Sequence, residues 1–150
     1  MRLTSFTDYG LRVLIYVAAQ PEGRATIAEI AAAFAVSENH LTKVVHFLGK
    51  SGYLHTTRGR GGGLRLARPA DHINVGEVVQ RAEGVVVAAE CFEPGSSACV
   101  IAGGCRLQGA LAEAVKAFHA VLAQYTLQDM IANRASLIRV WNRALPRSAA

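Results

Sequence analysis

Several features that define whole classes of protein are missing from this sequence. No apolar run reaches the roughly 18 residues that a membrane-spanning helix needs. The opening residues MRLTSFTDYG lack the apolar core of a secretory signal. We therefore expect a cytoplasmic protein with no membrane partner. A nucleotide-binding glycine fingerprint, a pair of catalytic carboxylates and a Ser/His/Asp set are missing too, so we expect no enzyme.

Cysteine is scarce, with three residues in a chain of 150. An odd number argues against a framework of paired disulfides. Cys91, Cys99 and Cys105 all lie in the segment ECFEPGSSACVIAGGC, which is rich in Gly, Ser and Pro. Buried cysteines that act as small hydrophobic side chains are the alternative, but this segment does not have the pattern of a core. The grouping favours a metal centre on a loop, with a coordination position that can stay open.

Thiolate ligands suit soft metals, so the choice lies mainly between zinc and an iron–sulfur cluster. Structural zinc sites have four closed ligands, often in CxxC pairs. This chain has no CxxC, and no histidine lies between the three cysteines. An iron–sulfur cluster is therefore the better prediction. A 4Fe-4S cluster needs a fourth ligand from elsewhere, and zinc stays the alternative.

Acidic residues are absent between Glu38 and Asp71, an interval that holds six Lys and Arg residues. Residues 1–70 hold nine Lys/Arg and four Asp/Glu, whereas residues 71–150 hold seven of each, so the whole net charge of +5 belongs to the N-terminal half. A one-sided basic field indicates double-stranded nucleic acid as a partner. A solvated basic surface is the plainer interpretation.

The N-terminal half has the pattern of a winged helix-turn-helix. Apolar periodicity and capping residues predict three helices with N-caps at Ser5, Thr26 and Ser37, and Glu29 follows Thr26 at the spacing of a capping box. Two strand-like pieces, 53–57 and 64–67, flank an Arg- and Gly-rich loop and predict a β-hairpin. A hairpin directly after the second helix of a helix-turn-helix is a wing, so this half is predicted to bind DNA.

In such a module the third helix lies in the major groove, and its N-terminal residues face the bases. The residues that we expect to contact DNA there are Ser37, Asn39, His40 and Lys43. Arg58 and Arg60 flank Gly59 at the wing tip, where arginine suits a narrow minor groove. A symmetric dimer would read a palindromic operator with half-sites about one helical turn apart.

The C-terminal half predicts a short helix over 75–83, the cysteine loop, a long helix from Arg106 and a last helix that follows a capping box of Thr126 and Asp129. Apolar residues in the long helix recur in steps of four and three, which indicates packing against a second copy of the chain: Leu107, Leu111, Ala114, Phe118, Val121 and Tyr125. Packing onto its own domain is the alternative. We predict a mainly α fold with a small β-hairpin, a winged helix-turn-helix plus a long dimerisation helix. The expected divisions are 1–84, 85–104 for the cluster-binding loop, 105–143 for the dimerisation helices and 144–150 for a disordered tail.

Four segments carry a resemblance to a known family: MRLTSFTDYGLRVL, GRGGGLRLA, GCRLQGALAEA and YTLQDM. The sequence resembles the Rrf2 family of winged-helix regulators over about residues 1–133. The likeness is greatest to its nitric-oxide-sensing branch. The resemblance implies a homodimer with one iron–sulfur cluster per subunit, bound by Cys91, Cys99 and Cys105. A 4Fe-4S cluster is implied, with Asp8 of the partner subunit as the fourth ligand.

Without the resemblance, Asp8 belongs to an S-x-x-D capping box that begins at Ser5. With it, Asp8 becomes a metal ligand, and Arg12 can pair with it at i,i+4 as a cluster-linked switch. The function that follows is a repressor that senses nitric oxide through its cluster and releases DNA when the cluster is nitrosylated or lost.

The alternative is a sister branch, whose members respond to iron–sulfur status or redox state through a 2Fe-2S cluster. That branch often has a histidine just after the third cysteine, whereas Arg106, Leu107 and Gln108 follow Cys105 here. An electron carrier is a third possibility. It would not need residues 1–70 to carry all the net charge.

Overall fold

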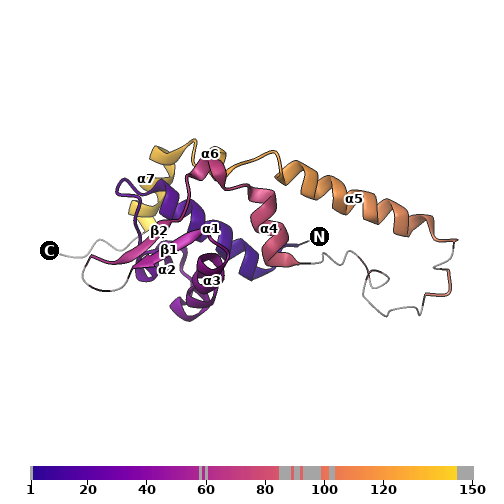
Figure 1. Cartoon of the computed structure of the whole chain (residues 1–150), viewed down its shortest axis with the longest axis horizontal. Helices are drawn as coiled ribbons and strands as arrows, with labels where there is room; N and C mark the ends of the chain where they lie inside the picture. Colours follow the sequence, from indigo (N-terminus) through magenta and orange to yellow (C-terminus); the bar gives the residue numbers. More distant parts are fainter. Residues whose placement is uncertain are drawn as a thin grey trace.

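The computed structural model describes residues 2–57, 59, 61–84, 89, 92, 99–101 and 104–144. The elements in chain order are α1 (Ser5–Ala19), α2 (Ile27–Phe34), α3 (Glu38–Lys50), β1 (Leu54–Thr57), β2 (Gly63–Leu66), a 3-10 turn η1 (Ala70–His72), α4 (Val75–Glu83), α5 (Arg106–Leu122), α6 (Leu127–Met130) and α7 (Arg134–Ala144) (Figure 1). The predicted fold class, mainly α with one β-hairpin, is confirmed. Most of the predicted loop 85–104 and of the predicted tail 144–150 lies outside the described residues.

The predicted N-caps are confirmed at Thr26 and Thr126, whereas Ser37 is the N-cap residue of α3 without a side-chain cap hydrogen bond. Thr26 and Glu29 form a reciprocal capping box at α2. The predicted box of Ser5 and Asp8 is wrong, because the N-cap of α1 is Thr4, whose side chain accepts from the backbone N–H of Thr7. Asp8 therefore lies inside α1 and is free of any capping role.

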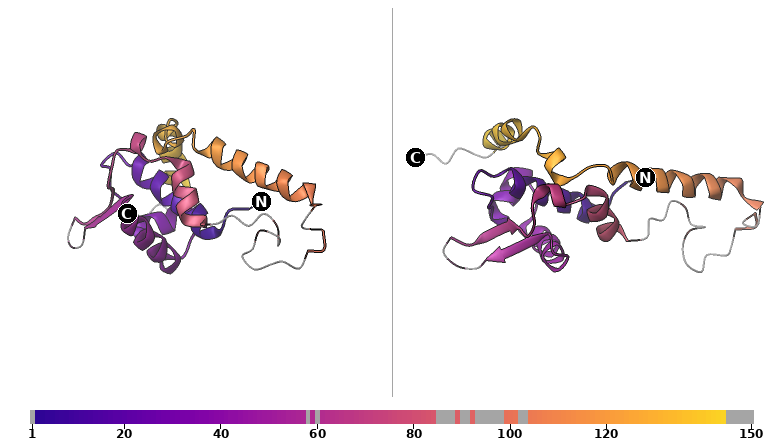
Figure 2. Two further views of the ribbon diagram at one scale, coloured as in Figure 1. Left: turned by 45° about the vertical axis from the view of Figure 1, so that its right-hand side comes forward. Right: turned by 45° about the horizontal axis from the view of Figure 1, so that its top comes forward.

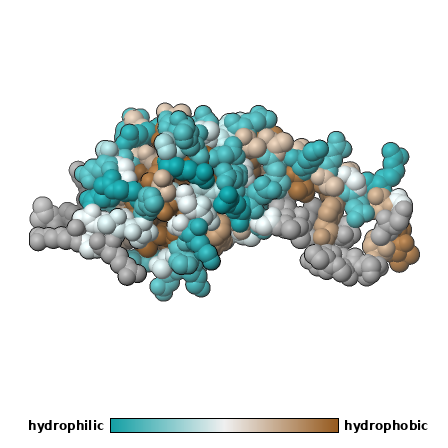
Figure 3. All heavy atoms as spheres, viewed as in Figure 1, coloured by the Kyte–Doolittle hydropathy of each residue, from teal (hydrophilic) through white to brown (hydrophobic). Residues whose placement is uncertain are grey.

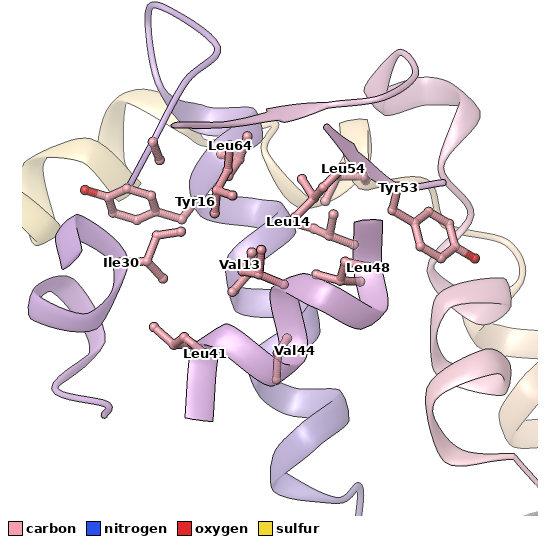
Figure 4. Packing of buried hydrophobic residues seen from close by; sticks show 14 of the residues in the cluster. Val13, Leu14, Tyr16, Ile30, Leu41, Val44, Leu48, Tyr53, Leu54 and Leu64 are labelled. Carbon is pink, nitrogen blue, oxygen red and sulfur yellow. The ribbon is translucent and has the colours of Figure 1, made fainter. Parts of the chain in front are cut away.

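The core lies where α1 crosses α3 beneath the hairpin (Figure 4). Helical spacing places the apolar side chains of α3 on one face, and strand alternation turns Leu54 and Leu64 toward the same space. The largest fully buried side chains include Leu14, Leu48 and Tyr53. Each buried side chain of this size contributes roughly 1.5–3 kcal/mol. This core fixes α3 and the wing relative to one another.

The hairpin pairs β1 and β2 in antiparallel register, from Leu54 opposite Leu66 to Thr57 opposite Gly63. Both strands lie within one residue of the predicted positions. A single bridge between Ala25 and Leu64 adds the segment between α1 and α2 to the edge of β2.

We call α1 to α4 with the hairpin the N-terminal unit. Helix α5 extends away from this unit, and none of its residues is buried (Figures 1 and 2). Its C-terminal end is fastened to α4. A Cβ at Gly76 would lie 2.7 Å from the backbone nitrogen of Ala123, and Asn74 Nδ2 donates to the Ala123 carbonyl over 2.7 Å. The close approach of α4 and α5 therefore depends on glycine at position 76.

The chain then returns to the N-terminal unit through α6 and α7. Thr126 and Asp129 form the predicted capping box at α6. Trp141 of α7 is buried against Tyr16 of α1, with ring centroids 4.7 Å apart. Arg134 Nε donates to the carbonyl of Ala19 at the end of α1 over 2.7 Å. Within the described ranges, no helix is both long and apolar enough to cross a membrane.

Candidate DNA interface and metal centre

The four residues of the third helix that were predicted to contact DNA form one exposed surface. Ser37, Asn39, His40 and Lys43 are all exposed at the N-terminal end of α3, and the buried residues of that helix face the core. Ser37 is the N-cap residue of α3, but its side chain makes no cap hydrogen bond. The hydroxyl, amide, imidazole and ammonium groups of this surface can all hydrogen-bond bases or phosphates.

The turn that aims α3 has an unusual backbone at Ala35. This residue has φ of 53° and ψ of 45°, the left-handed conformation, at the C-cap of α2. A side chain there costs roughly 1 kcal/mol because its Cβ crowds the following carbonyl. Ala35 is the one described non-glycine residue with positive φ. Sequence reasoning missed it, since alanine carries no signal for a left-handed turn.

The first strand of the wing, β1, packs against α3. Gly59 and Gly61 have φ of 93° and 80°, which fits the tight tip that the sequence predicted. Arg58 and Arg60, the predicted contacts at the tip, lie outside the described residues. His55 and Arg65 are exposed partners on β1 and β2.

A small open hollow of about 160 Å³ joins α1 to the α3 surface. Its lining residues are Ser5, Phe6 and Tyr9 from α1 and His40, Lys43 and Val44 from α3. Phe6 also meets Phe47 edge-on, with ring centroids 5.3 Å apart. The first turns of α1, which include Asp8, therefore lie directly against the helix that is predicted to read DNA.

Asp8 and Arg12 form the predicted i,i+4 pair. Arg12 Nε donates to Asp8 Oδ1 over 3.1 Å, and Arg12 Nη2 lies 2.8 Å from Oδ2. Both side chains are more than 40% exposed, at 43% and 44%, so the carboxylate can still be reached from outside. The Arg12 guanidinium also lies over the rings of Phe34 and Tyr9, at 5.6 Å and 6.0 Å. Through Arg12, Asp8 is linked to α2 of the helix-turn-helix.

Glu83, which sequence reasoning missed, binds the N-cap residue of α1. Its Oε1 accepts from the backbone N–H of Thr4 over 2.8 Å and from Thr4 Oγ1 over 3.0 Å. Burial opposes ionisation of this carboxyl, but hydrogen bonds from Thr7 and Thr4 outweigh it and lower the pKa of Glu83. The last residue of α4 thus holds the first turn of the helix that carries Asp8.

A second polar group joins the wing to α4. Glu77 lies 3.0 Å from Arg81 and 3.7 Å from Arg68, which follows β2. Both guanidinium groups lie over the buried ring of Tyr53, at 4.7 Å for Arg68 and 5.8 Å for Arg81. Burial and the nearby Glu77 raise the pKa of Tyr53. The helix that precedes the cysteine segment is therefore tied to both ends of the hairpin.

Two of the three predicted cysteine ligands fall within the described residues. Cys99 is exposed and Cys105 is half-buried, and both are free thiols. Cys91 lies outside the described residues. Cys105 is the N-cap residue of α5, and its side chain makes no cap hydrogen bond. Across the described ranges, no three His, Cys, Asp or Glu residues lie close enough to hold a metal ion.

Apolar side chains come to the surface near the start of α5 and along it. Val100, Ile101, Leu107 and Val121 are 100%, 65%, 65% and 52% exposed. Figure 3 shows apolar atoms at the surface at this far end of the molecule, whereas polar residues cover much of the N-terminal unit on the face shown. Among the described residues, the predicted stripe on α5 is therefore exposed at Leu107, Val121 and Tyr125 and half-buried at Leu111 and Phe118.

A helix-turn-helix with a wing and an exposed polar recognition helix defines a winged-helix DNA-binding protein. The family model for Rrf2, described as iron-dependent transcriptional regulators, matches residues 3–133. This chain belongs to the Rrf2 family.

Named relatives and solved structures agree with that assignment. The chain is 49% identical over 138 residues to the transcriptional regulator NsrR of Geobacillus kaustophilus, covering 91% of this chain and 94% of that protein. It is 45% identical over 141 residues to NsrR of Bacillus subtilis, covering 93% and 97%. The structure of T. potens IscR is similar with a TM-score of 0.70 and 25% identity, over 89% of this chain and 88% of that one. Oxidised CymR of Staphylococcus aureus shares the fold at 24% identity, with a TM-score of 0.69 over 88% and 97%.

Proposed function

We propose that this protein is a homodimeric, iron–sulfur-dependent transcriptional repressor that releases its operator in response to nitric oxide. The observation that carries the proposal is the position of the cysteine segment. It follows α4, whose last residue Glu83 accepts a hydrogen bond from Thr4 at the start of α1, and it ends at Cys105, the N-cap of α5. The proposed metal ligands and the proposed dimer helix are thus consecutive in the chain, and Glu83 joins them to α1, whose first turns lie against the DNA-reading helix. The NsrR-named relatives, 44–49% identical over about nine tenths of the chain, support the same function.

DNA binding would use the surface formed by Ser37, Asn39, His40 and Lys43 in the major groove. Arg58 and Arg60 would enter the adjacent minor groove. The basic charge of residues 1–70 supplies the attraction to phosphate that both contacts require.

The metal centre would be held by Cys91, Cys99 and Cys105, with Asp8 of the partner subunit as the fourth ligand. The donor chemistry fits, since the described thiols are free and the Asp8 carboxylate is almost half exposed. When bound, a 4Fe-4S cluster supplies iron that reacts with nitric oxide. Its carboxylate position would be the most easily displaced, because oxygen is a harder ligand than sulfur.

Asp8 and Arg12 would pass the state of the metal centre to the reading head. Both Asp8 oxygens contact Arg12, so iron bound by this carboxylate would compete with a guanidinium that also has Phe34 and Tyr9 as neighbours. When Asp8 is released, Arg12 takes the carboxylate back. Phe34 ends α2, directly before the turn at Ala35, so a shift of Arg12 acts where α3 is aimed.

The dimer would form through α5. An exposed apolar stripe on a helix that extends away from its own domain is a surface for a second helix of the same kind. This arrangement would also bring the Asp8 of one subunit to the cysteine segment of the other.

One alternative has an observation in its favour. The solved structure of IscR matches the fold with a TM-score of 0.70, so a 2Fe-2S sensor of iron–sulfur or redox status is the second candidate. The residues after Cys105 argue against it, because His119 is the nearest histidine downstream.

The two candidates separate on anaerobically purified protein. Absorbance and native mass spectra would be recorded before and after stepwise addition of nitric oxide, with DNA retention followed on the same samples. A 4Fe-4S mass that disappears together with DNA binding supports the repressor proposed here. A 2Fe-2S or zinc mass, or DNA binding that ignores nitric oxide, contradicts it. Cys105→Ala is the control that should assemble no cluster.

A further inference from the structure

The wing is supported by more than its own two strands. The backbone N–H of Ala25 donates to the carbonyl of Leu64 over 3.1 Å, and the N–H of Leu64 donates to the carbonyl of Ala25 over 2.7 Å. Gly63 permits this approach, because a Cβ there would lie 2.8 Å from the Ala25 carbonyl oxygen. The segment between α1 and α2 therefore forms a third edge of the wing.

One side chain of that segment reaches toward the wing tip. Arg24 Nη1 donates to the carbonyl oxygens of Gly61 and Gly62, over 3.1 Å and 3.2 Å. Its Nη2 lies 3.4 Å from Glu22 Oε2. The backbone of Glu22 is itself held, since Arg65 Nη1 donates to its carbonyl over 3.0 Å. The guanidinium is thus fixed between Glu22 and the tip.

The tip needs such support because its glycines supply little order of their own. Gly59, Gly61 and Gly63 all have positive φ, and glycine loses more conformational freedom than any other residue when its backbone is fixed. A tip that is already ordered loses less entropy when it enters a groove of DNA. A contact that orders the tip therefore raises affinity without touching DNA.

We propose that Arg24 is a positioning residue for DNA recognition, which orders the wing tip through the carbonyls of Gly61 and Gly62. The inference rests on the proposed role of the wing in DNA binding. It adds a determinant that lies outside both the recognition helix and the hairpin. Direct contact of Arg24 with a phosphate is the competing explanation, and the experiment separates the two.

The probe is an operator duplex selected from random DNA with the full-length, anaerobically purified protein. Its affinity is measured for Arg24→Ala, Arg24→Lys and the matched charge control Arg139→Ala, whose residue is exposed on α7. We expect Arg24→Ala to weaken binding about tenfold, equivalent to about 1.4 kcal/mol. Lys, which cannot reproduce the guanidinium fork, should fall between, and the control should bind normally.

The same substitution is then made in a protein whose Arg58 and Arg60 are already Ala. A residue that acts through the wing should cost no further affinity there, whereas an independent phosphate contact should again cost about tenfold. Amide exchange at Gly62, whose N–H donates to the Gly59 carbonyl over 2.9 Å, should accelerate in Arg24→Ala while that of α3 stays unchanged.

An additive loss, or unchanged affinity and exchange in Arg24→Ala, overturns this inference. If replacing Arg58 and Arg60 weakens DNA binding but replacing Arg24 does not, the inference about Arg24 is overturned and the proposed role of the wing stands. No loss with any of the three arginines overturns the proposed role of the wing and this inference with it.

Discussion

Glu83 accepts two hydrogen bonds from Thr4, which lies 79 positions earlier in the chain. Thr4 is the N-cap of α1, where the partial positive charge of the helix end favours a carboxylate. Glu83 is the last residue of α4 and precedes the cysteine segment. This pair fixes the helix that carries Asp8 to the start of the segment that carries the cysteines. We therefore expect a movement of the cysteine segment to change the position of α1, and the reverse.

The first prediction is that Glu83→Gln destabilises the protein in a way that depends on pH. The pKa of Glu83 is lowered from 4.5 in the fold, so its ionised form stabilises the fold above the ordinary pKa. This contribution is lost as the pH falls through the lowered pKa. We expect a loss of about 1 kcal/mol at neutral pH, because the hydrogen bonds are charge-assisted but partly exposed.

Urea unfolding of both proteins, near neutral pH and again below the lowered pKa, measures this effect. The difference should shrink in acid, where both side chains are neutral. Glu113→Gln, at an exposed position on α5, is the control and should match the parent at both pH values. If the two proteins have the same free energy of unfolding, or if their difference is as large in acid as at neutral pH, the charge of Glu83 does not stabilise the fold.

The second prediction concerns the turn before α3. Ala35→Gly should stabilise the fold by about 0.5–1 kcal/mol, because glycine adopts φ of 53° without the crowding of a Cβ. Part of the gain is offset by the greater freedom of glycine in the unfolded chain. Ala32→Gly, at an exposed position inside α2, should destabilise by about 1 kcal/mol instead. Equal effects of the two substitutions in thermal or urea unfolding would show that the backbone of Ala35 is not strained.

Local patterns predicted most of the fold. The capping boxes at Thr26 and Thr126 are confirmed, and apolar spacing gave α3 and α5 with nearly correct bounds. The N-cap of α1 was assigned one residue late, at Ser5 instead of Thr4, because both are good N-cap residues. Thr4 donates a hydrogen bond to Glu83, and a local sequence pattern cannot predict a contact between residues so far apart in the chain.

In the candidate site, too, contacts within one helix could be predicted and contacts between elements could not. The exposed face of α3 and the pairing of Asp8 with Arg12 follow from helical spacing, so both could be predicted. The contacts of Arg12 with Phe34 and of Arg24 with the wing tip join different elements. Side-chain identity does not reveal such contacts before the chain is folded. The roles of the cysteines and of Asp8 as ligands stay predictions.

The third prediction is that charge on the apolar stripe of α5 separates the dimer. Val121→Asp places a carboxylate on a surface that would be buried between two copies of α5, and burying an unpaired charge costs at least about 2 kcal/mol. The dissociation constant should rise by about 30-fold or more. Val140→Asp is the matched control, since Val140 is 58% exposed on α7.

Light scattering with size-exclusion chromatography, over a range of concentrations, gives the mass of each variant. Val121→Asp should shift toward the monomer while Val140→Asp stays a dimer. A monomeric parent protein, or two variants that stay dimeric alike, contradicts dimerisation through this face of α5.

The fourth prediction separates two kinds of DNA contact on α3. Lys43 lies beside the hollow between α1 and α3, one turn after Asn39, and both are exposed. If Lys43 contacts a phosphate, Lys43→Ala should weaken binding to all duplexes alike. It should also make the dependence of affinity on salt shallower, by about two units of slope for a dimer that loses one contact per subunit.

Asn39→Ala should act differently, because an amide reads a base edge. It should cost about 1–3 kcal/mol on the selected operator, cost little on unrelated DNA, and leave the salt slope almost unchanged. Titrations at several salt concentrations on both duplexes distinguish these patterns, with Lys116→Ala of α5 as the charge control. If Lys43→Ala and Asn39→Ala lose affinity with the same salt slope and the same sequence dependence, the two residues do not have the separate roles assigned to them. Since the exposed face of α3 carries both side chains within one turn, that result would move base reading to the remaining residues of this surface, Ser37 and His40.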